Sequence, residues 1–142
     1  MRPWPRTGER GFVATELAAG IGLLLVPVAC LVLTLPTWSE RQTTARAIAR
    51  EVGRSTAVSG RCDQAAAVVL TREMAANLGL DPADATVTLD CAPGARLARG
   101  ASVTARVTVQ VPAVDVPGIG SVGAWTWTAA HTETVDPYRS YP

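Results

Sequence analysis

The chain has 142 residues and a formal net charge of +1, which allows for one modest domain and gives no general attraction to nucleic acid or to anionic surfaces. All 13 cationic residues are arginine, and together with the abundance of Ala, Val and Gly this composition is typical of a high-GC bacterium. We therefore expect no nucleic-acid partner.

A short basic leader opens the chain. Residues 1–11 have no hydrophobic periodicity, and we predict this leader to be unstructured and cytoplasmic before any processing. Its arginines do not decide the membrane orientation, because four more arginines follow the apolar run within the relevant window: Arg41, Arg46, Arg50 and Arg54.

An apolar run follows the leader. Leu17 to Leu35 contain no charged residue and would rise about 28 Å as a helix, close to the roughly 30 Å thickness of a bilayer core. Residues 12–36 are therefore predicted to form a transmembrane helix. Pro27 and Pro36 each remove a backbone donor, so we expect a kink near Pro27.

The same helix is predicted to continue outward as an amphipathic extension over residues 37–58. One face is apolar and the other carries arginines at a spacing of four, which is typical of a solvated face. Phe12 to Val58 would then be one rod of roughly 70 Å. The apolar stripe consists of Ala45, Ile48, Ala49 and Val52, and the basic stripe of Arg46, Arg50 and Arg54.

Residues 59–142 are predicted to form a small α+β head. After a break at residues 59–61, Asp63 is a suitable cap for a short helix over residues 64–77. Three stretches with strand periodicity follow, so the expected fold is a long N-terminal helix, a short helix and a three-stranded antiparallel β-meander. The predicted buried side of the short helix is Ala66, Val69, Leu70 and Met74, and the strands cover residues 85–91, 102–111 and 123–135.

The cysteines favour an oxidising compartment for the head. Cys62 and Cys91 flank the predicted short helix, and a disulfide between them would contribute roughly 3 to 4 kcal/mol in the chain-entropy model. We therefore predict a single-pass protein of the cell membrane with a cytoplasmic N-terminus and an extracytoplasmic head. Cys30 lies inside the apolar run, where a small buried hydrophobe is expected.

No catalytic or metal-binding arrangement is apparent. His131, the single histidine, falls on a predicted strand and not beside a cysteine or paired carboxylates. Cys62 and Cys91 lack the second pair of ligands that a zinc site needs. We therefore expect neither enzymatic activity nor a metal, another cofactor or a small-molecule substrate.

Two tryptophans offer a possible contact surface. Trp125 and Trp127 lie two residues apart, hence on one face of the last predicted strand. Core packing is the default interpretation, and an exposed aromatic strip that contacts a partner is the alternative.

Glu16 is the least expected residue of the chain. A charge at the bilayer centre costs about 2.5 to 3.5 kcal/mol, and less at the edge, where this carboxylate lies. Spacing alone is compatible with an interfacial side chain that points to water. Gly11 and Phe12, four residues before Glu16, suggest a more specific interpretation.

Gly11, an apolar Phe12, Glu16 and then a membrane-length helix resemble the processing and assembly signature of bacterial type IV prepilins. The arginine-rich leader, the Arg- and Ala-rich outer helix and the strand-rich head narrow the resemblance to TadE-like minor pilins or pseudopilins of actinobacterial tight-adherence (Flp-type) pilus systems. Leu17 stands where major Flp pilins have tyrosine, and the head is larger than theirs. Both departures favour a minor component.

The resemblance implies a set of partners and roles. A prepilin peptidase would cut between Gly11 and Phe12, and the new ammonium group of Phe12 would need a carboxylate, which Glu16 of a neighbouring subunit or of the same helix supplies. The expected partners are this peptidase, other pilin-like subunits and the pilus assembly platform.

Two alternatives to a processed pilin remain. A lipoprotein signal would lipidate Cys30, but Pro27 stands where a branched aliphatic residue is usual, and the mature chain would begin with an apolar segment. A permanently anchored single-pass protein would use its small head to bind a partner and would never polymerise.

Overall fold

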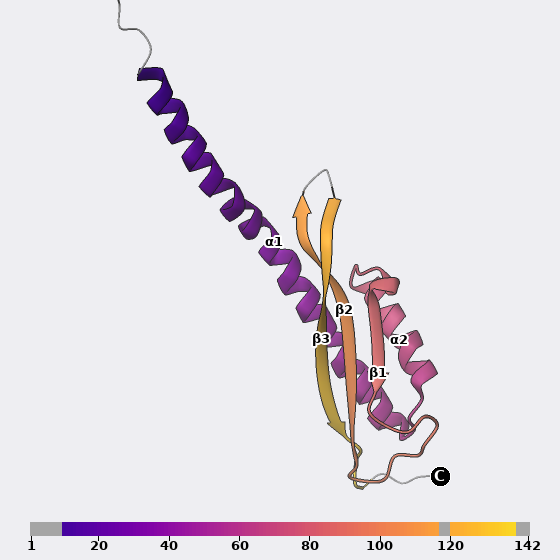
Figure 1. Cartoon of the computed structure of the whole chain (residues 1–142). Coiled ribbons are helices and arrows are strands. Elements are labelled where there is room, and N and C mark those ends of the chain that lie inside the picture. Colours follow the sequence, from indigo (N-terminus) through magenta and orange to yellow (C-terminus); the bar gives the residue numbers. More distant parts are fainter. Residues whose placement is uncertain (1–9, 117–119, 139–142) are drawn as a thin grey trace, which may run out of the picture.

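The structure is a computed structural model that describes residues 10–116 and 120–138 and has the expected α+β architecture (Figure 1). Three predicted segments lie wholly or partly outside the described residues: the leader at 1–9, a turn at 117–119 and the end of the tail at 139–142. In chain order the elements are α1 (Arg10–Ser59), α2 (Gln64–Asn77), the 3-10 helix η1 (Pro82–Asp84), β1 (Ala85–Leu89), β2 (Ser102–Val116) and β3 (Gly120–Thr134).

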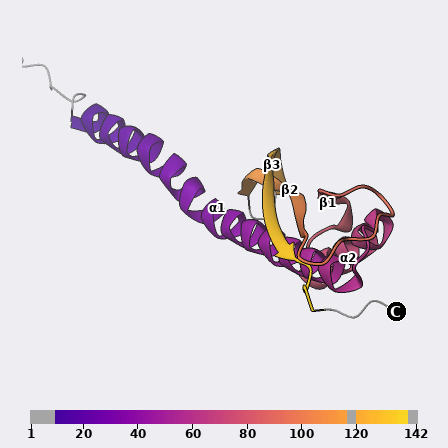
Figure 2. The same ribbon diagram turned by 90° about the horizontal axis from the view of Figure 1, so that it is seen from below.

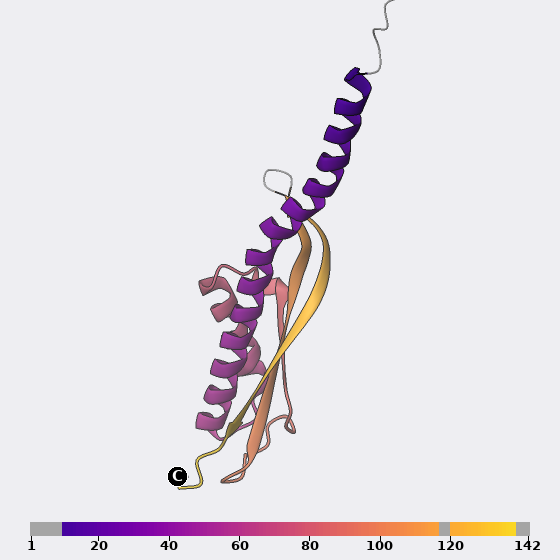
Figure 3. The same cartoon turned by 90° about the vertical axis from the view of Figure 1, so that its left-hand side faces the viewer.

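α1 is a single rod of 50 residues. Its backbone stays helical through Pro27 and Pro36, and Figure 3 shows a shallow bend with no break in place of a sharp kink. Each proline removes one backbone hydrogen bond, whereas the rest of the helical ladder remains intact. The first half of the rod projects away from the head, and the second half packs on it (Figures 1 and 2).

The sheet is antiparallel, in the order β1-β2-β3. β1 pairs with β2 only from Ala105 to Val109, so β2 and β3 continue past it as a two-stranded ribbon (Figure 1). The alternation predicted for β2 is confirmed, because every second side chain is fully buried: Val103, Ala105, Val107, Val109 and Val111.

The core lies between one face of the sheet and the two helices. The predicted apolar stripe of α1 is confirmed, since Ala45, Ile48, Ala49 and Val52 are all 0% exposed. These side chains and small residues of α2 form one cluster with the buried face of β2. The opposite face of the sheet is polar and carries cross-strand threonine hydrogen bonds, Thr104 to Thr132 and Thr108 to Thr128.

The predicted buried side of α2 was partly wrong: Leu70 and Met74 pack against the core, but Ala66 and Val69 are exposed, a rotation of about one residue. The helix has the predicted bounds and the Asp63 cap, but it buries Ala67, Thr71 and Ala75, whereas Val69 is 55% exposed. The Gln64 amide explains the rotation: its Nε2 donates to the carbonyl of Val87 at 2.8 Å, and its Oε1 accepts from the amide of Leu89 at 3.1 Å. These bonds turn the helix face that contains residue 64 toward β1.

Side chains of α1 cover the edge of β2 that β1 leaves unpaired after Val109. Arg41 Nη1 donates to the carbonyl of Gln110 at 3.0 Å, and Trp38 Nε1 donates to the carbonyl of Pro112 at 2.7 Å. Arg41 also pairs with Asp84 at 3.1 Å, immediately before β1 begins. A free strand edge invites pairing with other chains, so these bonds both protect the edge and dock the rod on the head.

The predicted disulfide between Cys62 and Cys91 is present. It joins the connection after α1 to the end of β1, and Cys62 is 1% exposed. Around it lies a second apolar cluster that includes Ala57, Leu97 and Val135. The far end of the head is therefore held by a covalent bond as well as by packing.

Candidate functional site

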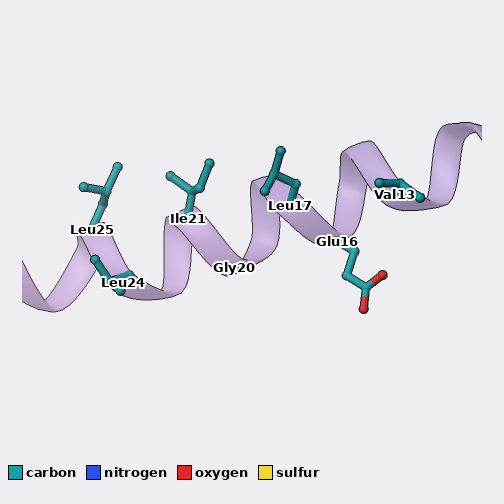
Figure 4. Close-up of a pocket in the computed structure, with 7 residues that line it drawn as sticks. All are labelled: Val13, Glu16, Leu17, Gly20, Ile21, Leu24 and Leu25. Carbon is teal, nitrogen blue, oxygen red and sulfur yellow. The ribbon is translucent and has the colours of Figure 1, made fainter.

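The most distinctive surface is a shallow groove on the projecting half of α1. It is lined by Val13, Glu16, Leu17, Gly20, Ile21, Leu24 and Leu25 (Figure 4). The helix surface at Gly20 is open, because a Cβ built at this glycine would meet nothing within 4 Å. The Glu16 carboxylate points away from the helix, on the side opposite to Leu17, Ile21 and Leu25 (Figure 4).

Glu16 is exposed and forms no ion pair or hydrogen bond with another described residue. Its neighbours in the groove are apolar and exposed, with Val13 at 66% and Leu17 at 64%. A carboxylate in apolar surroundings is stabilised by a cation or a donor that approaches it. The groove therefore offers both an apolar contact and one carboxyl group without a partner among the described residues.

The predicted processing site lies at the start of the same helix. α1 begins at Arg10, so the peptide bond between Gly11 and Phe12 belongs to its first turn. The side chain of Phe12 lies outside the described residues. Terminal helical turns fray readily.

The apolar run is exposed along most of its length. Leu23 is 81% exposed and Leu24 67%, and only 6% of the most hydrophobic window of α1 is buried in the molecule. This low burial separates the segment from the core helix of a soluble domain. Among the described residues, α1 is the one helix long and apolar enough to cross a membrane.

Three tryptophans meet where the rod joins the head. Trp38 and Trp125 pack edge to face with ring centroids 6.3 Å apart, and Trp125 and Trp127 do so at 6.2 Å. Trp127 packs against the core, as the default interpretation predicted, whereas Trp125 is 38% exposed. Only Trp125 is therefore accessible for the partner contact considered from the sequence, which stays a prediction.

The basic stripe of α1 is exposed, as the pattern predicted. Arg46 lies over the ring of Trp127, with its Cζ 5.8 Å from the centroid. Arg54 forms an ion pair with Glu51 at 3.0 Å. The hydrogen bond from Arg54, aided by its charge, lowers the pKa of the Glu51 carboxyl below its ordinary value.

The structure places His131 on β3, where its Nε2 lies 3.0 Å from Glu133. The described residues contain no group of three or more His, Cys, Asp or Glu side chains that could hold a metal ion. Cys30 has a free thiol and is half-buried on the rod. His131 and Glu133 lie on β3, whereas Cys30 lies on α1, five residues after Leu25 of the groove.

Sequence reasoning missed the residues whose side chains bond the two helices to the strands. Trp38, Arg41 and Gln64 act on strand edges through bonds that span 23 to 74 positions of the chain. The one signal for Trp38 was its place just after the apolar run, where an interfacial tryptophan is common.

Comparison with known protein families, functionally characterised proteins and solved structures reveals no match to this chain.

Proposed function

We propose that the protein is a prepilin-like minor pilin or pseudopilin, similar to TadE-like proteins, that is processed after Gly11 and takes part in assembling a tight-adherence (Flp-type) pilus or secretion filament. The observation that carries the proposal is Glu16, which has no ion pair with another described residue, in an exposed apolar groove of a rod whose first half the head does not cover. A helix of this kind is built to be covered by lipid or by other helices.

Processing supplies the missing partner of Glu16. Cleavage between Gly11 and Phe12 leaves an ammonium group on Phe12, and a buried ammonium needs a carboxylate nearby. Glu16 of an adjacent subunit meets that need and fixes the register between the two rods. Gly20 and the neighbouring leucines provide the close helix contact that such a pairing requires.

The proposed topology places residues 1–11 in the cytoplasm, residues 12–36 in the membrane, and the rest outside. The Cys62–Cys91 disulfide supports an oxidising compartment for the head, because disulfides persist outside the cytosol. The partners in this proposal are a prepilin peptidase, other pilin-like subunits and the assembly platform. No catalytic role is proposed for the chain itself.

The proposal is tested by co-expressing the full chain with a tight-adherence prepilin peptidase and measuring its mature N-terminus by mass spectrometry. We expect a chain that begins at Phe12, and we expect Gly11→Val to abolish the cut while the matched Gly20→Val leaves it intact. An intact leader would support the permanently anchored protein, and a lipidated Cys30 would identify a lipoprotein. Either result overturns the proposal.

Assembly is tested separately from processing. Glu16→Gln removes the charge with little change of shape, so we expect normal cleavage and a loss of crosslinking to other pilin subunits. Glu40→Gln is the matched control, because Glu40 is also exposed on α1 but lies beyond the apolar run. Equal crosslinking by both variants would show that Glu16 has no role in assembly.

A further inference from the structure

We propose that the end of the β2–β3 ribbon is a second membrane-contacting element, which lies in the outer lipid–water interface beside α1. The ribbon end consists of residues 112–116 of β2 and 120–124 of β3. Its ligand is the phospholipid bilayer itself. The inference rests on the proposed function to the extent that α1 must cross a membrane with the head outside.

The depth of the ribbon end follows from two hydrogen bonds. Arg41 bonds to Gln110 and Trp38 to Pro112, so β2 advances toward the N-terminal half of α1. From Pro112, the four further residues to Val116 extend about 13 Å along the strand. That length equals about nine residues of α1 at about 1.5 Å each, so the ribbon end reaches past Leu35 into the apolar run. Figure 1 shows the ribbon extending past β1 on the side of the N-terminal half of the rod, with the rod slanting away from the ribbon end.

Burial at the end of the apolar run indicates that the head covers α1 at this level. Thr34 is 2% exposed, whereas its neighbours Leu33 and Leu35 are 59% and 47% exposed. Cys30, one turn earlier, is half-buried. Cys30, Thr34 and Trp38 lie at intervals of four residues. They extend, toward the N-terminus, the stripe of α1 that the head covers from Ala45 to Val52. The ribbon is the part of the head that extends to this level (Figures 1 and 3).

The outer face of the ribbon changes from polar to apolar at this level. On β2 the positions of this face change from polar residues to Pro112, which is buried, and Val114, which is half-buried; the polar residues are Thr104, Arg106, Thr108 and Gln110. On β3 the paired positions change from Thr128 and Thr126 to Ala124 and Val122. Val122 is 61% exposed, although it is large and apolar. An apolar environment around Val122 would remove this surface from water, which is favourable.

Tryptophans and charges mark the same boundary. The Trp38, Trp125 and Trp127 cluster lies where the outer face changes, and tryptophan is enriched at the membrane–water interface. Asp115 is the single ionisable residue between Arg106 and His131. The apolar ribbon end, the tryptophans and the end of the apolar run all lie at the same height along α1. A lipid–water interface requires this shared height, whereas a protein partner in water does not.

The test measures the environment of single spin labels on the full chain in vesicles of phosphatidylcholine and phosphatidylglycerol. In a Cys30→Ala background with the disulfide intact, a nitroxide is attached to Val122→Cys, to Leu24→Cys or to Ala130→Cys. Val122 and Ala130 are both exposed and lie on the same face of β3. Leu24 reports on the span itself. Power saturation compares access of lipid-soluble oxygen with access of a water-soluble nickel chelate.

We expect the label at Val122 to favour oxygen over the chelate, as at Leu24, and the label at Ala130 to favour the chelate. If Leu24 favours oxygen and Val122 resembles Ala130, the inference is overturned while the membrane span stands. If Leu24 itself favours the chelate, the proposed function fails first. If Val122 is shielded from both reagents and the shielding disappears when the protein is diluted in lipid, a second copy covers the ribbon end, which also overturns the inference.

Discussion

The indole Nε1 of Trp38 donates a 2.7 Å hydrogen bond to the carbonyl oxygen of Pro112, 74 residues later in the chain. This bond joins the rod to the ribbon at the point where the rod leaves the head. It also occupies a strand-edge carbonyl that β1 is too short to reach. The relationship therefore sets how the projecting helix is held on the head.

We predict that Trp38→Phe weakens this junction. Phenylalanine keeps an aromatic ring against Trp125 but leaves the Pro112 carbonyl without its donor, which costs about 1 to 2 kcal/mol for a buried group. The free energy of unfolding in urea, measured on the full chain in a non-ionic detergent, should fall by that amount. Hydrogen exchange should increase first in the ribbon.

Trp125→Phe is the matched control for that prediction. It removes an indole from the same cluster, but the Trp125 ring forms no hydrogen bond to another described residue. The unfolding free energy should change less than for Trp38→Phe. Equal losses would mean that ring packing, and not the hydrogen bond, holds the junction.

The disulfide is predicted to be a major source of stability for the head. Cys62 and Cys91 are separated by 29 positions, and the chain-entropy model gives about 3 to 4 kcal/mol for closing a loop of this length. Replacing both cysteines by serine should lower the unfolding free energy by that amount in detergent. Cys30→Ser, which breaks no bond, should leave the head unchanged, and a similar loss in this control would refute the assignment.

Gly53 is predicted to be a point where the rod must approach β3 closely. A Cβ at this position would lie 3.3 Å from the His131 ring and 3.8 Å from the Ala105 methyl group. Gly53→Leu should therefore separate the rod from the sheet and cost about 1 to 3 kcal/mol of unfolding free energy. Ser55→Leu places the same side chain on the exposed face of α1 and should cost much less; no difference between the two would contradict close packing at Gly53.

The fold was largely predictable because its strongest signals are periodic. Alternation marked the buried face of β2, and the spacing of Ala45, Ile48 and Val52 marked the buried stripe of α1. The rotation of α2 was not predictable, because it depends on the Gln64 side chain bonding to β1, a contact between segments 23 residues apart. Val69 consequently faces outward despite its apolar character.

The candidate site was likewise predictable only in part. Glu16 stands out in the sequence as a charge beside an apolar run, and the structure adds the groove around Gly20. The ribbon end could not be inferred from the sequence, since its level along the rod depends on the pairing of Trp38 with Pro112. Local patterns predicted the elements, and long-range side-chain bonds fixed how the elements meet.

The ion pair between Arg54 and Glu51 predicts a small effect of pH. Since the folded-state pKa of Glu51 is lowered, the pair stabilises the fold above the ordinary carboxyl pKa, and this stabilisation is lost as the pH falls through the lowered value. Both side chains are well exposed, 64% for Arg54 and 39% for Glu51, so solvent screens most of the interaction. Arg54→Gln should raise the pKa of Glu51 in an NMR titration with almost no change in unfolding free energy. Arg50→Gln, which removes an exposed arginine one turn earlier, should leave that pKa unchanged, and an equal rise in both variants would show that general charge and not the ion pair sets it.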